Sequence, residues 1–216
     1  MIKENRGFFM DIVQRGKRWV GLVFNRPYIP VELKEATGPL LLHISDTPQE
    51  IYSYIFRLVK LLEPSYIIHT GDLVDDIKLE LHPNEIEAYK TALRKFISGL
   101  ESFTDALIYY AVGNHDQYKE VKKTTSKGIV IKEGHILIEE KNFYVSHYYS
   151  KKVYNTDYYL YGHSFRPSSY KSQQHIGLNG LEKIHVIDLT TQKIYHLPYP
   201  FGTNQFRKME QRRISL

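Results

Sequence analysis

Several polar residues that could bind metals or move protons directly follow apolar runs of the sequence. The runs end in Ile44-Ser45-Asp46, His69-Thr70-Gly71-Asp72, Val112-Gly113-Asn114-His115-Asp116, Val145-Ser146-His147 and Tyr161-Gly162-His163. Carboxylate, amide and imidazole groups bind divalent metals, and imidazole also transfers protons near neutral pH. The chain contains no cysteine, so a metal would have to be held by His, Asp, Glu or Asn.

Each of these residues also has an ordinary structural interpretation. An isolated Asp, such as Asp46 or Asp72, often caps a turn. A lone His147 or His163 can be a hydrogen-bonded residue of a sheet, and glycines before polar residues can simply mark turns. The five polar ends together are harder to explain in this way, because the carboxyl ends of strands in an α/β sheet converge on one crevice.

The elements that would position these residues follow an α/β pattern from Pro39 onward. Strands are predicted at 39–45, 66–70 and 107–112, and amphipathic helices at 49–62 and 84–100. Closely spaced strands are predicted at 128–131, 136–138, 143–147, 158–161, 184–189 and 193–197. The second half of the chain therefore predicts a mainly antiparallel sheet.

One folded domain is expected, because 216 residues with 42% hydrophobic and 25% charged content are typical of a compact globular chain. We assign residues 38–200 to this domain. Residues 1–37 are predicted to be an N-terminal lead-in element with a strand at 18–24. Residues 201–216 are predicted to be a weakly structured, basic C-terminal tail that carries Arg207, Lys208, Arg212 and Arg213.

The order and spacing of the motifs resemble the calcineurin-like metallophosphoesterase superfamily. Its pattern is Asp-x-His, Gly-Asp, Gly-Asn-His-Asp/Glu, a later His and Gly-His-x-His, and the match runs from about Leu40 to Phe165. The resemblance implies an α/β fold of two packed mixed β-sheets flanked by helices, arranged as a four-layer α/β/β/α sandwich. It also implies a metal-dependent hydrolase of phosphate esters.

By this resemblance, Asp72 would bridge two metal ions. Asn114, His147 and His163 would complete the site of one ion, and Asp46 would belong to the site of the other. A mixed set of oxygen and imidazole ligands suits a divalent metal, with Mn²⁺ expected first and Fe or Zn²⁺ as alternatives.

The sequence departs from the family pattern at two ligand positions, both in the same metal site. Pro48 stands where Asp-x-His has its histidine, and Phe165 stands at the last histidine of Gly-His-x-His. Neither side chain can bind a metal, so one tight site and a second that is weak or absent are expected. Water, substrate oxygens or a side chain such as Gln49 or Glu50 would have to supplement the second site. His43 is a poor substitute, because it should point to the other face of its strand.

The resemblance implies hydrolysis of a phosphomonoester or phosphodiester through a metal-activated water. His115 would face the leaving group as a general acid or charge stabiliser, with Asp116 behind it. Arg166 could bind a substrate phosphate, although a solvated arginine is the ordinary alternative. The alternative for the whole chain is a non-catalytic metal-binding or protein-interaction module on the same fold.

The formal net charge of +5 favours anionic partners. A phosphate-ester substrate fits this charge; nucleic acid remains open, although no recognised nucleic-acid motif supports it. No apolar run reaches the roughly 18 residues that span a bilayer, so no membrane partner and a cytoplasmic location are expected. The sequence indicates neither the identity of the substrate nor an oligomeric state.

Overall fold

The computed structural model describes residues 26–153 and 155–208. The strand expected at 18–24, and Arg212 and Arg213 of the basic tail, lie outside the described residues. The first described helix is α2 (Val31–Lys34), which buries Leu33 against the core. The boundaries drawn at 37/38 and 200/201 stay predictions.

The first sheet contains six strands in the order β11-β10-β1-β2-β3-β4. Its strands are β1 (Leu40–Ile44), β2 (Tyr66–His69), β3 (Leu107–Ala111), β4 (Ile129–Ile131), β10 (Ile184–Asp188) and β11 (Ile194–Leu197). The four strands from β1 to β4 run parallel, while β10 and β11 pair antiparallel. The carboxyl ends of β1, β2 and β3 therefore lie at one edge of the sheet.

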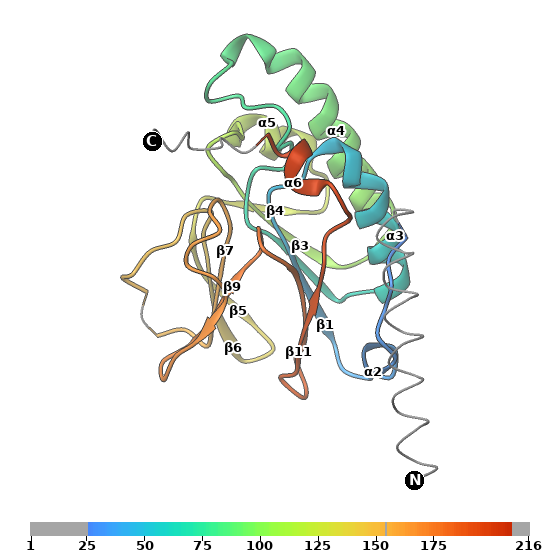
Figure 1. Ribbon diagram of the computed structural model, residues 1–216, viewed down its shortest axis with the longest axis vertical. Helices are drawn as coiled ribbons and strands as arrows, with labels where there is room; N and C mark the ends of the chain where they lie inside the picture. The colour runs from blue at the N-terminus through green and yellow to red at the C-terminus, as the bar shows by residue number, and fades with distance from the viewer. Residues whose placement is uncertain (1–25, 154, 209–216) are drawn as a thin grey trace, which may run out of the picture.

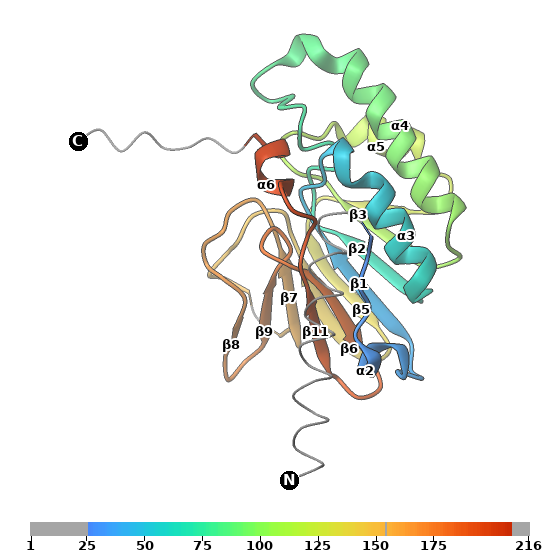
Figure 2. The same cartoon turned by 45° about the vertical axis from the view of Figure 1, so that its right-hand side comes forward.

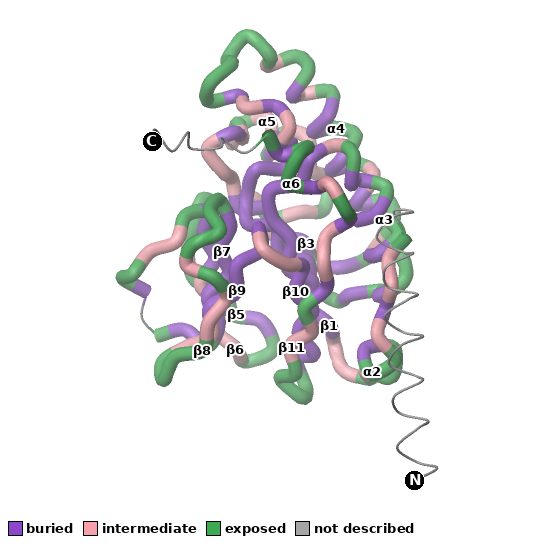
Figure 3. Tube along the Cα trace, in the orientation of Figure 1, coloured by how far each residue is buried: buried purple, intermediate pink, exposed green. Residues whose placement is uncertain are grey.

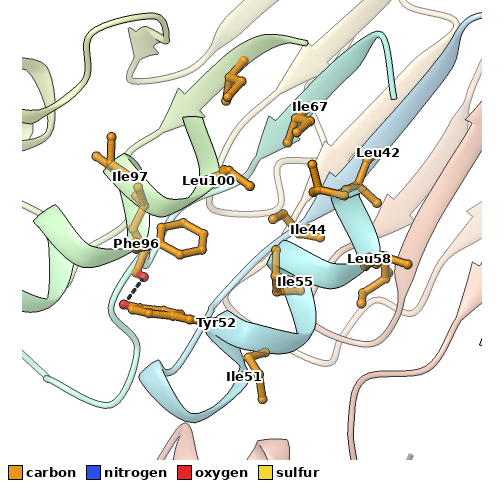
Figure 4. Packing of buried hydrophobic residues seen from close by; sticks show 14 of the residues in the cluster. Leu42, Ile44, Ile51, Tyr52, Ile55, Leu58, Ile67, Phe96, Ile97 and Leu100 are labelled. Atoms are coloured by element: carbon orange, nitrogen blue, oxygen red, sulfur yellow. Dashed lines mark hydrogen bonds between the residues drawn. The ribbon is translucent and has the colours of Figure 1, made fainter. Parts of the chain in front are cut away.

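Helices cover one face of this sheet, as Figures 1 and 2 show for α3 and α4. They are η1 (Gln49–Ile51), α3 (Tyr52–Leu62), η2 (Pro83–Glu85), α4 (Ile86–Ser102) and the short α5 (Tyr118–Thr124). Apolar residues at helical spacing in α3 and α4, such as Ile55 and Phe96, pack on Leu42 and Ile44 of β1 (Figure 4). The two long helices confirm the sequence pattern, whereas α5 was not predicted because Val121 is its single buried residue.

The second sheet has five strands in the order β5-β6-β7-β9-β8. They are β5 (Gly134–Ile138), β6 (Lys141–Val145), β7 (Tyr158–Tyr161), β8 (Tyr170–Lys171) and β9 (Ile176–Asn179). The expectation of a mainly antiparallel second half is wrong, because β6, β7 and β9 pair in parallel. The connections after β6 and β7 are long enough to return the chain in the same direction, and β10 and β11 join the first sheet instead.

The two mixed sheets pack face to face and flank a second apolar core, which confirms the expected sandwich of sheets and helices. Leu41, Ile68 and Ile187 of the first sheet meet residues of the second, such as Phe143 and Leu160. Figure 3 shows that burial is concentrated in the strands, while the outer turns of the helices are exposed. The outer side of the second sheet carries a smaller cluster of tyrosines around Tyr159 and Tyr161.

None of the described helices has the length and apolar character needed to cross a membrane.

Two buried histidines lie side by side between the sheets. His43 of β1 and His185 of β10 stack with ring centroids 5.4 Å apart, and the His43 Nε2 lies 3.0 Å from the Thr70 hydroxyl. The His43 ring therefore lies between the sheets, and it belongs to neither cluster of possible metal ligands among the described residues. Burial lowers the pKa of His43 well below its usual value and that of His185 to about 3. Both rings are therefore neutral in the folded protein at neutral pH.

These histidines should make the protein sensitive to acid. Below pH 6.5 the unfolded chain takes up protons that the folded chain does not, so the free energy of unfolding falls as pH decreases from 6.5 toward 3. Replacing His185 by Phe should reduce this slope by up to about 1.4 kcal/mol per pH unit. Urea unfolding between pH 7.5 and 4.5 measures it, with His135→Phe at an exposed position of β5 as control. Identical slopes in His185→Phe and wild type would contradict the conclusion that His185 is neutral in the folded protein.

Candidate metal centre

Four predicted ligands converge at the carboxyl ends of the strands. The Asn114 Oδ1 lies 3.0 Å from the His147 Nε2 and 3.1 Å from the His163 Nδ1. The His147 Nε2 also lies 3.4 Å from the Asp72 Oδ2. The side chains of Asp72, His147 and His163 each offer a ligand atom, and these atoms lie within 4.8 Å of one another.

The donor set and its spacing fit a single divalent ion. Ligand atoms that each lie about 2.0–2.2 Å from one ion are separated from their neighbours by about 3 Å. The distances from the Asn114 oxygen to the two imidazole nitrogens match that spacing. The ligands would be two imidazoles, one amide oxygen and one carboxylate, a set that suits Mn²⁺, Fe or Zn²⁺.

A backbone carbonyl orients the His147 ring for this role. The His147 Nδ1 lies 2.8 Å from the Thr70 carbonyl oxygen, and only a protonated Nδ1 can donate to a carbonyl. In the neutral ring the Nε2 is then free of a proton and directed at Asn114 and Asp72. A hydrogen bond from the second ring nitrogen is how proteins usually fix the tautomer of a metal-binding histidine.

Asp72 and His147 stabilise each other's charged forms. Burial alone would raise the pKa of the Asp72 carboxyl and lower that of His147, but their mutual attraction outweighs burial and shifts each pKa in the opposite direction. Both side chains are nearly inaccessible, at 2% and 3% relative exposure. The metal-free site therefore holds an ionised Asp72 carboxylate, which is the form that binds a cation, and a protonated His147 ring, whose Nε2 proton a bound metal ion would displace.

Three of the predicted ligands adopt a left-handed backbone conformation. The φ angles are 50° at Asp46, 55° at Asp72 and 65° at His163. Non-glycine residues rarely occupy this region, and such strain concentrates at functional sites. Each of these residues lies directly beyond a strand or its following turn, so the sharp change in direction places its side chain toward the common edge.

Asp116 holds two of the loops together. Its carboxylate accepts hydrogen bonds from the backbone amides of Asp72, Leu73 and Gly113 at 2.8, 3.0 and 2.9 Å, and from the Tyr89 hydroxyl at 3.1 Å. Sequence reasoning placed Asp116 behind the His115 ring, but the hydrogen bonds of its carboxylate go to the backbone instead. Asp116 is thus a positioning residue for Asp72.

His115 lies beside this cluster on the wall of the cavity. Its backbone amide donates to the Asp72 Oδ1 at 2.9 Å, and its ring nitrogens lie 3.1 and 3.3 Å from the Asn114 amide nitrogen. Burial lowers the pKa of His115, partly offset by the Asp72 carboxylate. The ring is therefore close enough to the candidate ligands to act on a group bound there.

The half of the site that lacks two histidines keeps Asp46. The Asp46 side chain is 2% exposed and accepts a hydrogen bond from the His163 backbone amide at 3.2 Å. Pro48 is buried at the start of η1, and Phe165 lies on the cavity wall. Gln49 does not supplement the ligands, because its amide donates to Asp76 at 2.7 Å.

Sequence reasoning missed three charged residues of the segment after Asp72. Asp75 is 2% exposed and its carboxylate binds the Lys78 ammonium group. The Glu80 carboxylate accepts a hydrogen bond from the Asn114 amide nitrogen at 2.6 Å, which turns the Asn114 oxygen toward the histidines. The only sequence signal was their position within eight residues of the Gly-Asp motif.

The ligands open into a cavity of about 750 Å³. Its wall includes Asp46, Asp72, Asn114, His115 and His163, together with the missed residues Asp75, Lys78 and Glu80. Arg166 and Lys208 also line the cavity, and a role of Arg166 in binding substrate phosphate stays a prediction. His147 lies behind the wall, buried beneath His163 with ring centroids 5.0 Å apart.

The expectation of a weakly structured tail is wrong for residues 203–208. α6 (Thr203–Phe206) lies near the upper end of the strands in Figure 1, and Arg207 is fully buried. The Arg207 guanidinium donates to the carbonyl oxygens of Asp46, Ser45 and Leu181 at 2.7, 3.2 and 2.8 Å, and lies 4.4 Å from the Tyr199 ring centre. The prediction of a weakly structured tail considered only the charges of neighbouring residues. It failed because the partners of Arg207 lie far away in the sequence.

A family model and solved structures of known proteins were found to be similar to the chain. The chain matches the model of the calcineurin-like phosphoesterase family over residues 39–197. A solved structure of an archaeal phosphodiesterase is similar with a TM-score of 0.54 and 15% identity, covering 73% of this chain and 98% of that chain. Yfce, a phosphoesterase from E. coli, has a TM-score of 0.49 and 14% identity, covering 72% and 96%. No curated protein matches the sequence.

The contacts of Arg207 predict a stabilising role. Arg207→Met should lower the free energy of unfolding by about 3 kcal/mol, because it leaves buried carbonyl groups without donors. Arg207→Lys keeps the charge but not the planar fork, so it should recover only part of the loss. Urea unfolding of both variants measures the effect, with the exposed Lys60→Met as control. Wild-type stability in Arg207→Met would contradict the role.

Proposed function

We propose a function from one established premise: the chain belongs to the calcineurin-like phosphoesterase family. In this proposal the chain hydrolyses a phosphomonoester or phosphodiester. It uses one tightly bound divalent ion, with Mn²⁺ as the first candidate and Fe or Zn²⁺ as alternatives. Because the archaeal structure is that of a phosphodiesterase, a diester is the first substrate to test. A cytoplasmic location also remains a prediction.

The observation that carries this proposal is the convergence of Asp72, Asn114 and the two histidines. Two hydrogen bonds support it independently of the family. The Thr70 carbonyl leaves the His147 Nε2 available as a ligand, and the Glu80 carboxylate turns the Asn114 oxygen toward the same point. Asp72 and His147 are buried, and buried ionisable groups of this kind have little use in folding, because each costs free energy to desolvate.

A divalent ion bound there would lower the pKa of a water molecule and neutralise phosphate charge. The chain's own residues supply the remaining steps. Arg166 and Lys208 can bind the non-bridging oxygens of a phosphate that enters the cavity. Burial lowers the pKa of His115, while the negative charge of a bound phosphate favours its protonated form. His115 can then hold a proton for the leaving oxygen.

The second candidate is a non-catalytic metal-binding or protein-interaction module on the same fold. It is favoured by one observation, the presence of Pro48 and Phe165 at two family ligand positions. The retained His115 favours hydrolysis instead, because neither a metal-binding nor a partner-binding module needs a proton donor. The oriented His147 supports metal binding in either case.

Hydrolysis of bis-p-nitrophenyl phosphate across a Mn²⁺ titration tests the proposal. Wild type should turn over the substrate, and Asn114→Ala should lose at least about 100-fold in kcat/KM. The reason is that loss of even a residue that only hydrogen-bonds a metal ligand lowers metal affinity or activity by about 10- to 100-fold. His135→Ala, at an exposed histidine of the second sheet, is the matched control. No turnover by wild type at any Mn²⁺ concentration would favour the non-catalytic module.

The role of His115 gives a separate prediction. His115→Ala should lower kcat by about 10²–10⁴-fold, the usual effect of losing a general acid, and leave Mn²⁺ affinity unchanged. Steady-state kinetics and isothermal titration with Mn²⁺ measure the two quantities in parallel. If the variant loses Mn²⁺ affinity together with activity, His115 acts as a ligand and not as a proton donor.

A further inference from the structure

We propose that the ammonium group of Lys78 takes the electrostatic role of the second metal ion in this site. The inference rests on the proposed function, because it says which group balances the carboxylates on the side that lacks two histidines. It concerns a residue outside the family motifs, and its test counts bound ions instead of measuring hydrolysis.

The first observation is an excess of buried negative charge. Asp46, Asp72 and Asp75 are each 2% exposed and line the same cavity. Carboxylates this close repel each other, and burial adds a desolvation cost for each charge. The ion held by Asn114 and the two histidines would neutralise part of this charge. A positive group on the side of Asp46 and Asp75 would offset this repulsion.

The second observation is that this side offers few ligands for a metal. Pro48 and Phe165 cannot coordinate an ion, and Gln49 is bound to Asp76. The rings of His147 and His163 are both directed at the Asn114 oxygen. Neither of the two family histidines that would complete a metal site beside Asp46 is therefore present in this chain.

The third observation is that Lys78 already supplies a cation there. Its Nζ forms an ion pair with the Asp75 carboxylate, and its side chain is 16% exposed and lines the cavity. Ile77 and Leu79 on either side are 7% and 4% exposed and anchor the segment in the core. The Lys78 carbonyl also accepts from the amides of Leu81 and His82 at 2.9 and 2.8 Å. The ammonium is therefore held in place.

An ammonium group matches part of what a metal ion provides. It carries one positive charge and three hydrogen-bond donors, so it can neutralise carboxylates and bind a non-bridging phosphate oxygen. It has no empty coordination position and cannot activate water. Lys78 therefore replaces the charge of a second ion, and water activation is left to the single metal.

Removing this cation should let a metal take its place. Asp72, Asp75 and His115 already place ligand atoms within 4.8 Å of one another, with Lys78 paired to Asp75. Without the ammonium these groups have the charge and the spacing to hold an ion. Lys78→Met should then bind one more Mn²⁺ per chain than wild type, while Lys78→Arg, which keeps the charge, should bind the wild-type number.

The experiment is equilibrium dialysis with Mn²⁺, read by the electron paramagnetic resonance of free Mn²⁺. Lys78→Gln, also uncharged, repeats the test if Lys78→Met does not fold. Lys90→Met is the matched control, because Lys90 forms an exposed ion pair with Glu87 at the same spacing of three residues. Equal counts in wild type and the uncharged Lys78 variant would overturn the inference.

The difference between variant and wild type separates this inference from the proposed function. A gain of one ion supports the role of Lys78 whatever the wild-type count is. A wild-type chain that binds no Mn²⁺ would contradict the proposed metal centre alone. Two ions already bound in wild type, with no gain in Lys78→Met, would contradict the role of Lys78 alone.

Discussion

The geometry of the site depends on one half-buried carboxylate that accepts hydrogen bonds from backbone amides and a tyrosine. Asp116 accepts hydrogen bonds from the amides of Asp72, Leu73 and Gly113, so it joins the loop after β2 to the loop after β3. Gly113 has to be small there, because a Cβ atom at this position would lie 2.1 Å from the Asp72 Oδ1. The close approach of the two loops brings Asp72 and Asn114 to the same ion.

The loop after β1 is joined to the loop after β2 in a similar way. The backbone amide and side-chain amide of Gln49 donate to the two oxygens of Asp76 at 3.0 and 2.7 Å. Pro48 precedes this link with a φ of −74°, a value that proline prefers and that suits the start of η1. The residue that removes a family ligand therefore also stiffens the loop that carries Asp46. The loss of coordination and the gain of rigidity affect the same few residues.

Much of this arrangement could be predicted from the sequence, because the strands and their polar ends are local patterns. Apolar runs before Asp46, Asp72 and Asn114 identify three parallel strands, and parallel strands bring their carboxyl ends to one edge. The pairing of β10 with β1 could not be predicted, because strand spacing does not specify a partner. The same holds for Lys78 and Arg207, whose importance comes from groups that the fold brings near them and not from neighbouring residues.

The position of Arg207 links the site to the order in which the chain is made. Arg207 is separated by 161 positions from Asp46, whose carbonyl it binds. During synthesis β1 to β3 and their loops emerge long before the residue that fixes the Asp46 backbone. A nascent chain can therefore pair the parallel strands β1 to β4 and pack their helices while β10, β11 and the Asp46 side of the site are still unfinished. The site reaches its final form only when the last described segment folds back onto the first motif.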